Sequence, residues 1–175
     1  MKNKKIILKE LISNLNPINI SGDLEISIRG IAFDSRQVKK GDLFVAIRGL
    51  QKDGNIYQKQ AVEAGAVAIV SETFTSNLPV TFIQVKNARI ALAKLAAKFY
   101  EFPDRKLHLI GITGTNGKTT TAYLIRSILQ ASGRSTGLLG TIEYIVGDEK
   151  IPAKLTTPES LDLYRLLAQI CACEQ

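Results

Sequence analysis

GITGTNGKTTT, at residues 111–121, is the most informative part of the sequence for its architecture. This glycine-rich turn follows an apolar run at residues 107–112, which is typical of a buried central parallel strand. It precedes a segment, from Lys118 to just before Gly133, in which apolar side chains recur at helical spacing. A glycine-rich turn between a strand and a helix is the setting of a phosphate loop, so this order predicts nucleotide binding.

The residue types of the turn explain how it would bind phosphate. Glycines let successive backbone N–H groups point into one concavity, and the start of the following helix adds its positive end. Lys118 can reach the β- and γ-phosphates as a point charge, and the Thr119 hydroxyl is placed to bind Mg²⁺. Asn116 is better suited to shaping the loop than to catalysis, because Asn tolerates left-handed backbone angles.

One position departs from the general pattern G-x-x-x-x-G-K-[ST]. That pattern expects glycine at position 112, where the chain has Ile112, with glycines at 111 and 114 instead. The alternative interpretation is a strand-to-helix turn that binds nothing. Gly-Lys-Thr in this setting favours nucleotide binding.

Composition indicates a globular protein and excludes several other classes. The 175 residues are 45% hydrophobic and 22% charged, which is unlike a disordered chain. No apolar run approaches the roughly 18 residues of a membrane span. Lys9, Glu10 and Asn14 interrupt the apolar residues near the start, so we expect no secretion signal, no membrane partner and a cytoplasmic location.

The formal charge of +7 does not by itself identify a partner. The basic residues are scattered and no aromatic cluster accompanies them, so we expect no nucleic acid partner. Attraction to small anions such as nucleotide phosphates explains the charge equally well.

Cysteine and histidine offer little for a metal or catalytic centre. Cys171 and Cys173 have neither zinc-knuckle nor redox spacing, and we expect them to be small side chains on a helix. His108 is the only histidine and lies in an apolar run, which indicates a core or strand residue.

The first part of the chain alternates strand-like and helix-like segments. We expect strands at residues 28–33, 43–47, 67–70 and 81–85, and a helix at residues 57–64 that stops at Gly65. A longer helix, at residues 87–100, would begin at the N-cap Asn87. Its predicted apolar face consists of Ile90, Leu92, Leu95, Ala96 and Phe99. Phe102-Pro103-Asp104 then breaks the chain, which predicts domains at residues 1–103 and 104–175.

The second part begins a parallel sheet that the remaining residues do not complete. The helix from Lys118 would face inward through a set of apolar residues: Ala122, Leu124, Ile125, Ile128 and Leu129. A strand at residues 135–139, a two-stranded excursion at residues 141–155 turning at Gly147-Asp148, and a helix from Pro158 would follow. The fold class is therefore α/β, with a small N-terminal α/β domain followed by the start of a phosphate-loop domain.

Four groups of residues together resemble one family. TGTNGKTT at residues 113–120 is similar to the ATP loop of the Mur ligase superfamily, which accepts this glycine placement. FDSR at residues 33–36, KGDLFVA at residues 40–46 and Asp53-Gly54 resemble the N-terminal UDP-binding domain of MurE and MurF ligases. Residues 88–100 and Pro103 resemble the helix and hinge that end that domain. GLLGTI at residues 137–142 with LTTP at residues 155–158 resembles MurE rather than MurF.

This resemblance implies an ATP-dependent ligase of peptidoglycan precursor synthesis. In the family, ATP phosphorylates the free carboxylate of UDP-N-acetylmuramoyl-L-alanyl-D-glutamate. The amine of a diamino acid, usually meso-diaminopimelate or L-lysine, then attacks the acyl phosphate. The implied cofactor is Mg²⁺, and we expect a monomer.

The resemblance also assigns sites. It implies an ATP loop formed by Gly114, Thr115, Asn116, Gly117, Lys118, Thr119 and Thr120. It matches Ser35 to a serine that binds the uridine portion, and Thr156 and Thr157 to a pair that contacts the UDP-sugar. Ser35 could instead be an ordinary turn residue after Asp34, and Thr157 could be the N-cap of the last helix; a capped helix start can also bind an anion.

No catalytic residue is expected within the chain. The family's second metal-binding carboxylate, its modified lysine and the C-terminal domain that selects the amino acid would follow Gln175. We therefore expect a truncated or degenerate ligase that binds ligands without turnover. Two alternatives stay open, a non-catalytic UDP-sugar- and ATP-binding module and a MurF-type ligase; an unrelated phosphate-loop kinase is disfavoured by the upstream motifs.

Overall fold

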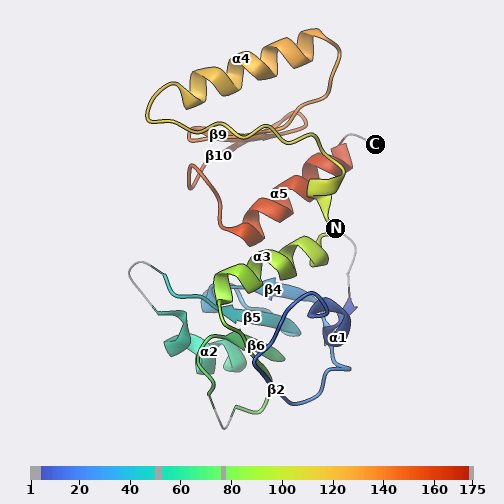
Figure 1. Cartoon of the computed structure of the whole chain (residues 1–175), viewed down its shortest axis with the longest axis vertical. Coiled ribbons are helices and arrows are strands. Elements are labelled where there is room, and N and C mark those ends of the chain that lie inside the picture. Colours follow the sequence, from blue (N-terminus) through green and yellow to red (C-terminus); the bar gives the residue numbers. More distant parts are fainter. Residues whose placement is uncertain (1–4, 50–52, 76–77, 174–175) are drawn as a thin grey trace. The chain divides into compact units, whose positions relative to one another are not determined.

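The structure is a computed structural model that describes residues 5–49, 53–75 and 78–173 (Figure 1). The chain divides into two compact units, Met1–Phe99 and Tyr100–Gln175. This division falls slightly before the predicted end of the first domain at residue 103. Each unit is described by itself below.

The first unit is built on a five-stranded sheet with the order β2-β7-β6-β5-β4. Its strands are β2 (Asn19–Ser21), β4 (Gly30–Ala32), β5 (Asp42–Ala46), β6 (Ala68–Ser71) and β7 (Thr81–Gln84). Strands β4 to β7 are parallel, with Phe44 opposite Ile69 and Ile69 opposite Phe82, while β2 pairs antiparallel at the edge. The predicted α/β class is confirmed.

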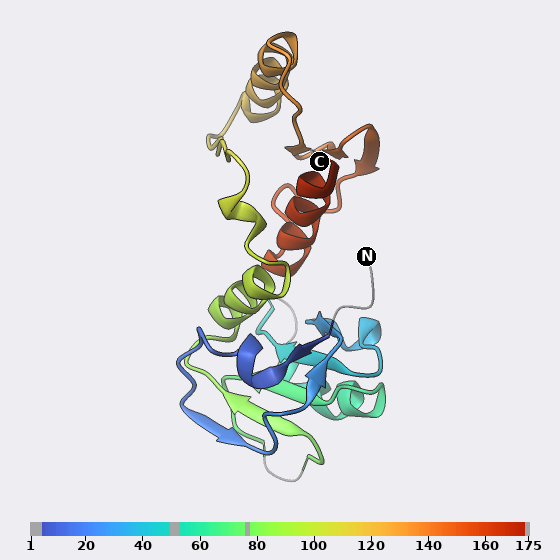
Figure 2. The same ribbon diagram turned by 90° about the vertical axis from the view of Figure 1, so that its right-hand side faces the viewer.

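Helices cover both faces of this sheet (Figure 2). The short helix α2 (Gln58–Glu63) follows the 3₁₀ turn η2 (Gly54–Tyr57), and its Ala61 joins a core cluster with Phe44, Ala46 and Ile69. Because neighbouring residues of a strand point to opposite faces, Leu43 and Val45 face the other layer. There α3 (Ala88–Phe99) contacts β5 and β6.

The N-terminal elements complete this unit. The helix α1 (Leu8–Leu11) contacts α3, and its Leu8 and Leu11 are fully buried. A separate two-stranded sheet pairs β1 (Ile6–Ile7) with β3 (Ser27–Ile28). The 3₁₀ turn η1 (Ser35–Gln37) connects β4 to β5.

The predicted start of α3 is confirmed, but one residue that was predicted to lie on its buried apolar face is exposed. Asn87 acts as the N-cap, since its Oδ1 accepts a hydrogen bond of 2.9 Å from the Ile90 N–H. Leu92, Leu95 and Phe99 are buried, whereas Ile90 is 57% exposed. At about 100° per residue, position 90 lies roughly 200° from position 92, on the side that faces away from the sheet.

The second unit contains a small antiparallel sheet between two helices. Its strands are β8 (Leu138–Leu139), β9 (Glu143–Val146) and β10 (Glu149–Pro152), in the order β10-β9-β8. Figures 1 and 2 show this sheet between α4 (Lys118–Ala131) and α5 (Ser160–Cys173). Leu166 and Ile170 of α5 pack on Tyr144 and Val146 of β9. The predicted two-stranded excursion, with its turn at Gly147-Asp148, is confirmed.

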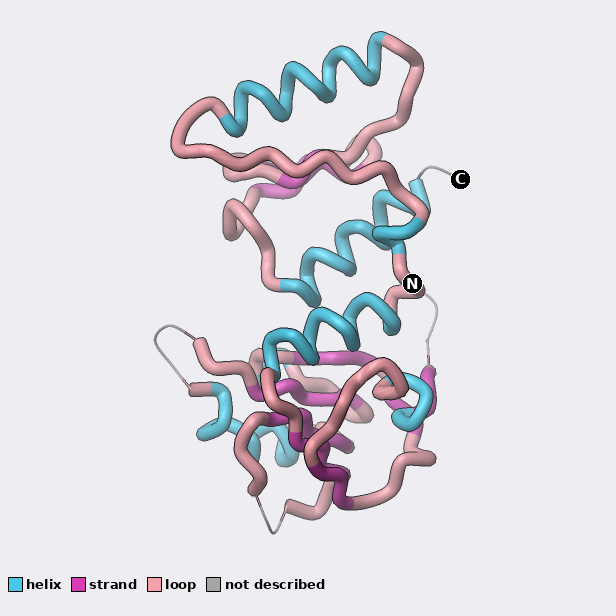
Figure 3. The backbone as a smooth tube through the Cα atoms, in the orientation of Figure 1, coloured by secondary structure: helices cyan, strands magenta, loops and turns pink. Residues whose placement is uncertain are grey.

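The predicted strand at residues 107–112 and the predicted burial of His108 are wrong in this structure. Residues 107–112 form no strand; they belong to the long loop between η3 (Pro103–Arg105) and α4 (Figure 3). Leu109 and Ile110 are each 58% exposed, and His108 is exposed rather than a core residue. A parallel strand forms only beside neighbours that supply ladder hydrogen bonds, and the described strands of this unit pair antiparallel with one another.

The helix α4 has the predicted extent but not the predicted burial. None of its residues is buried, and Leu124 and Ile128 are 60% and 68% exposed. Ala122, Ile125 and Leu129 are half-buried. The helical period indicates which apolar residues share one side of α4. The other described residues cover only part of that side.

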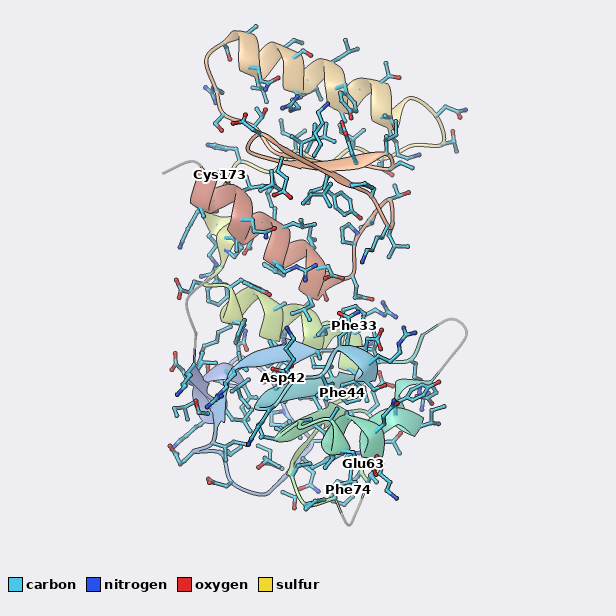
Figure 4. All side chains as sticks on the ribbon, turned by 180° about the vertical axis from the view of Figure 1, so that it is seen from behind. Phe33, Asp42, Phe44, Glu63, Phe74 and Cys173 are labelled. Carbon is cyan, nitrogen blue, oxygen red and sulfur yellow. The ribbon has the colours of Figure 1, made fainter. Side chains whose placement is uncertain are left out.

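The last helix starts later than predicted. It begins at Ser160, and the first helical bond runs from the Leu163 N–H to the Glu159 carbonyl, so Glu159 occupies the N-cap position. Pro158 is therefore not the first helical residue, and the interpretation of Thr157 as the N-cap is wrong. Cys171 and Cys173 lie on this helix and form no disulfide, and Cys173 is labelled near its end in Figure 4.

Within the described ranges, no helix is both long and apolar enough to cross a bilayer. The same residues contain no group of three or more His, Cys, Asp and Glu side chains that could hold a metal ion.

Candidate functional site: the phosphate loop and its surroundings

The backbone of the phosphate loop depends on two glycines. Gly114 has φ +148° and Gly117 has φ +76°, both in a region that side chains with a Cβ rarely adopt. Gly117 is the N-cap of α4, and its carbonyl accepts a hydrogen bond of 2.9 Å from the Thr121 N–H. The left-handed turn at Gly117 therefore directs the chain from the loop into the helix.

The loop presents unused backbone donors to solvent. Gly114, Thr115, Asn116 and Gly117 are all exposed. Among the hydrogen bonds of the described residues, none has an N–H of residues 113–117 as its donor. Apart from Gly117, its chain neighbours and nearby backbone of α4, no atom lies within 4 Å of the position that a Cβ on Gly117 would take, so a ligand can approach this backbone closely. Free amides at a helix N-terminus form an anion-binding arrangement.

Lys118 lies against the same loop. Its Nζ donates hydrogen bonds to the carbonyl oxygens of Gly114, at 2.5 Å, and Thr115, at 3.4 Å. The ammonium is thus positioned by the loop whose phosphate it would neutralise. When a nucleotide binds, the ammonium would donate instead to phosphate oxygens, whose negative charge makes them stronger acceptors than the two neutral carbonyls.

Thr119 and Thr120 follow in the first turn of α4. Thr119 is half-buried and Thr120 is exposed. A hydroxyl is a hard oxygen ligand that suits Mg²⁺, a cation that usually takes one or two protein ligands and fills its shell with phosphate and water oxygens. Thr119 therefore fits Mg²⁺ that arrives with ATP, and not a metal held by the protein alone.

The structure adds a contact behind the loop that the sequence did not predict. Tyr123, one turn after Thr119, donates a hydrogen bond of 2.6 Å to Glu143 Oε1 on β9. This hydrogen bond raises the pKa of Tyr123. Lys150 Nζ lies 3.6 Å from the same oxygen. Since α4 has no buried residue, this polar contact is one of the features that attach the loop-bearing helix to the sheet.

Ser35 lies in the first unit, at the start of η1. Asp34 caps this turn by accepting a hydrogen bond of 3.0 Å from the Arg36 N–H, and its bonds from the Arg36 side chain lower the pKa of Asp34. The Ser35 side chain is buried, and its Oγ donates a hydrogen bond of 2.9 Å to Gln60 Oε1 on α2. Ser35 therefore forms part of the capped turn, and its predicted contact with uridine stays a prediction.

Thr156 and Thr157 lie in the second unit, in the exposed segment before α5. The Tyr144 hydroxyl anchors the start of this segment, since it donates to the Leu155 carbonyl at 2.5 Å and accepts from the Leu155 N–H at 3.3 Å. Tyr144 is a supporting residue that the sequence did not single out. The predicted contact of the two threonines with a UDP-sugar stays a prediction.

Gly137, which belongs to the GLLGTI segment, has a packing role. A Cβ at this position would lie 2.5 Å from Ile170 Cδ1 of α5. Glycine therefore permits the close approach of this segment to the helix.

Comparisons with known proteins identify the family. The profile described as "Mur ligase family, catalytic domain" matches residues 27–100, and "Mur ligase middle domain" matches residues 112–174. Together they match more than three quarters of the chain. The chain belongs to the Mur ligase family. The second match contains most of the phosphate loop, and the tandem arrangement excludes an unrelated phosphate-loop kinase.

Named relatives refine the similarity of this Mur ligase chain. It is 47% identical over 163 residues to the UDP-N-acetylmuramoyl-L-alanyl-D-glutamate–2,6-diaminopimelate ligase of Clostridium tetani, covering 91% of the chain and 34% of that protein. It is 44% identical over 165 residues to the ligase of the same name from Bacteroides fragilis, covering 93% of the chain and 34% of that protein. The Mur ligase chain thus spans about a third of the length of these relatives.

Solved structures agree on the fold. A UDP-N-acetylmuramoyl-L-alanyl-D-glutamate–2,6-diaminopimelate ligase superposes with a TM-score of 0.72 and 23% identity, covering 98% of this chain and 34% of that one. MurF from Acinetobacter baumannii superposes with a TM-score of 0.63 and 22% identity, covering 97% of this chain and 34% of that one. At these identities the comparison supports the Mur ligase fold alone.

Proposed function

We propose that this chain provides the UDP-substrate-binding and ATP-binding parts of a MurE-type ligase in peptidoglycan precursor synthesis. In this assignment, residues 1–103 bind the UDP portion of UDP-N-acetylmuramoyl-L-alanyl-D-glutamate, and residues 104–175 bind ATP. The names of its relatives support the substrate class. The open amides of the phosphate loop, with the Lys118 ammonium against them, carry the ATP assignment.

The proposed reaction joins a carboxylate to an amine. The carboxylate oxygen of the substrate takes the γ-phosphoryl group of ATP, which releases ADP and forms an acyl phosphate. The amine of a diamino acid, meso-diaminopimelate or L-lysine, then forms the new C–N bond and loses a proton as inorganic phosphate leaves. Activation is needed because a free carboxylate is a poor electrophile.

Residues of this chain would contribute binding and charge neutralisation. The amides of residues 114–117 and the Lys118 ammonium would stabilise the negative charge on the transferred phosphoryl group. When bound with ATP at Thr119, Mg²⁺ would supply further charge neutralisation. Ser35, Thr156 and Thr157 would contact the UDP-sugar.

The assignment also covers amino acid selection, turnover, location and partners. The part of the relatives that lies outside this chain would select the diamino acid. The chain alone would therefore bind ATP and the UDP-sugar without completing the reaction. We propose that it acts in the cytoplasm as a monomer, without a nucleic acid or membrane partner.

Calorimetry on the wild type and on Lys118→Ala tests this proposal. The wild type should bind ATP–Mg²⁺ and UDP, and the substitution should remove ATP binding while leaving UDP binding intact. Lys59→Ala, at an exposed position on α2, is the matched control and should retain both. Unchanged ATP affinity in Lys118→Ala would remove Lys118 from the site.

A non-catalytic module would give the same binding data, so turnover must be measured separately. Co-expression with the remaining two-thirds of a relative, followed by an assay for phosphate release with all three substrates, distinguishes the two. A ligase fragment should restore turnover in the mixture, and a module that only binds should not.

A further inference from the structure

A hollow of about 220 Å³ lies in the first unit, away from the residues discussed so far. It is lined by Lys5, Ser27, Arg29, Lys40, Gly41 and Val67. Arg29 directly precedes β4, Gly41 directly precedes β5 and Val67 directly precedes β6, so the hollow lies at the amino ends of the parallel strands. Ser35 follows the carboxyl end of β4, at the opposite edge of the sheet. The hollow is therefore separate from the proposed UDP contact.

Positive charge dominates the lining. Lys5, Arg29 and Lys40 are exposed, and no acidic residue is among the lining residues. Within the part of the chain that the structure describes, none of the three forms an ion pair, whereas the nearby Lys9 is paired with Glu25 at 3.2 Å. Three unpaired cations around one hollow repel each other, and a bound anion would relieve that repulsion.

The stem of one of these cations lies against the backbone of Gly41. Gly41 has φ +93°, and a Cβ at this position would lie 2.9 Å from Arg29 Cδ, so the aliphatic stem of Arg29 crosses directly over the glycine. The Arg29 N–H donates to the Gly41 carbonyl at 2.9 Å, and the Gly41 N–H donates to the Gly65 carbonyl at 2.9 Å. The hydrogen bonds hold the backbone of Arg29 and Gly41 in place, and the absence of a side chain at Gly41 leaves room for the stem of Arg29 beside the hollow.

Asp42, the acidic residue that follows Gly41 in the chain, does not line the hollow. Asp42, labelled in Figure 4, is buried at the start of β5, and its Oδ2 accepts a hydrogen bond of 2.8 Å from the Lys39 N–H. Its Oδ1 lies beside Gly30, where a Cβ would be 2.6 Å away. Asp42 is therefore engaged with backbone on β4 and the preceding turn, and it is not among the residues that line the hollow.

We propose that this hollow is a binding site for a small phosphate-type anion, such as inorganic phosphate or pyrophosphate. Its volume is below the range of about 300–1,000 Å³ of pockets that enclose a drug-sized ligand, so it is too small for a whole nucleotide. A guanidinium binds two oxygens of a phosphate at once, and the two ammonium groups add point charges. The Ser27 hydroxyl is a further donor among the lining residues.

Titration with inorganic phosphate and pyrophosphate, followed by ³¹P NMR, tests this site. The Lys118→Ala background is used throughout, so that the phosphate loop contributes as little as possible. We expect saturable binding that Arg29→Gln with Lys40→Gln weakens by about tenfold or more. Lys59→Gln with Lys94→Gln, at two exposed positions of the same unit, removes the same charge elsewhere and should leave binding unchanged.

Three outcomes would overturn the proposal. One is an equal loss in both double variants, which would indicate general attraction by the net charge. Another is the absence of saturable binding. The third is tighter binding of a short single-stranded oligonucleotide than of pyrophosphate, lost in the Arg29 and Lys40 variant, which would indicate a nucleic acid surface.

Discussion

Lys118 Nζ lies 2.5 Å from the carbonyl oxygen of Gly114, so the cation expected to bind ATP phosphates rests on the loop itself. A compact ammonium fits between two carbonyls, whereas the planar guanidinium of arginine does not have the same geometry. We therefore expect Lys118→Arg to weaken ATP–Mg²⁺ binding almost as much as Lys118→Ala, as measured by calorimetry. The midpoint of thermal unfolding should change little, because exposed polar contacts contribute about 1 kcal/mol or less. Full ATP affinity in Lys118→Arg would show that charge alone is sufficient.

The two glycines that flank α4 can be compared directly, because they have similar backbone angles and only one of them belongs to the phosphate loop. Gly117, with φ +76°, precedes the helix, and Gly133, with φ +78°, follows it; neither has an atom within 4 Å of its missing Cβ. Alanine at either position should lower the free energy of unfolding by about 1–2 kcal/mol, the cost of a left-handed residue with a side chain. Only Gly117→Ala should also reduce ATP affinity, because its methyl group would occupy the space through which phosphate approaches. Equal ATP affinity in the two variants would place the nucleotide elsewhere.

Thr119 should determine the dependence of ATP binding on Mg²⁺. Thr119→Val keeps the shape of the side chain and removes the hydroxyl, so ATP affinity should respond less to added Mg²⁺. Thr121→Val, at an exposed position two residues later, is the control and should keep the wild-type response. The measurement is ATP affinity across a magnesium titration. An unchanged response in Thr119→Val would remove this hydroxyl from the metal shell.

The contact between Tyr123 and Glu143 predicts a pH effect. The hydrogen bond to Glu143 raises the pKa of Tyr123 above its ordinary value of 10.0, so the folded protein holds this proton more tightly than the unfolded chain. The corresponding stabilisation is complete below pH 10.0 and is lost as the pH rises through the raised pKa. The difference in tyrosinate absorbance between wild type and Tyr123→Phe should therefore titrate with a midpoint above pH 10.0.

Glu143→Gln should bring that titration back toward the ordinary value, since it removes the carboxylate acceptor and its charge. Glu149→Gln, at an exposed position on the neighbouring strand β10, should leave the titration unchanged. A Tyr123 titration that is insensitive to Glu143→Gln would contradict the contact.

Much of the fold could be predicted because its signals are local. The strands β5, β6 and β7 each contain adjacent apolar residues, Asn87 is a strong N-cap, and Gly147-Asp148 is a turn sequence; each forms the predicted element. The loop glycines could also be predicted, because positive φ angles at Gly114 and Gly117 require glycine. For the N-cap, the turn and the loop glycines, the deciding interaction lies within a few residues along the chain.

The incorrect predictions concern features that depend on distant partners. Residues 107–112 have the composition of a buried strand, but strand formation requires neighbouring strands, and composition cannot supply them. Ile90, Leu124 and Ile128 are apolar at helical spacing, yet nothing among the described residues buries them. The helical period indicates which residues share a face and not what covers that face.

The hydrogen-bond partners of the side chains at the candidate site could not be predicted from the sequence either. Ser35 bonds to Gln60 and Tyr123 to Glu143, across separations of 25 and 20 residues. Such pairs are set by the packing of α2 and α4 on their sheets, which one sequence does not reveal. The residue types at positions 114–120 indicated phosphate binding, and the structure adds that residues 114–117 are exposed and that their N–H groups donate no hydrogen bond to another described residue.

Nitrogen-15 NMR of the folded chain during titration with ATP–Mg²⁺ examines the phosphate loop most directly. The backbone amide signals of residues 114–120 should shift together and saturate, because these N–H groups would change from solvent to phosphate oxygens as partners. The amides of β5 and β6 should move little in the same titration. Saturable ATP binding that leaves residues 114–120 unshifted would show that this loop is not the phosphate site.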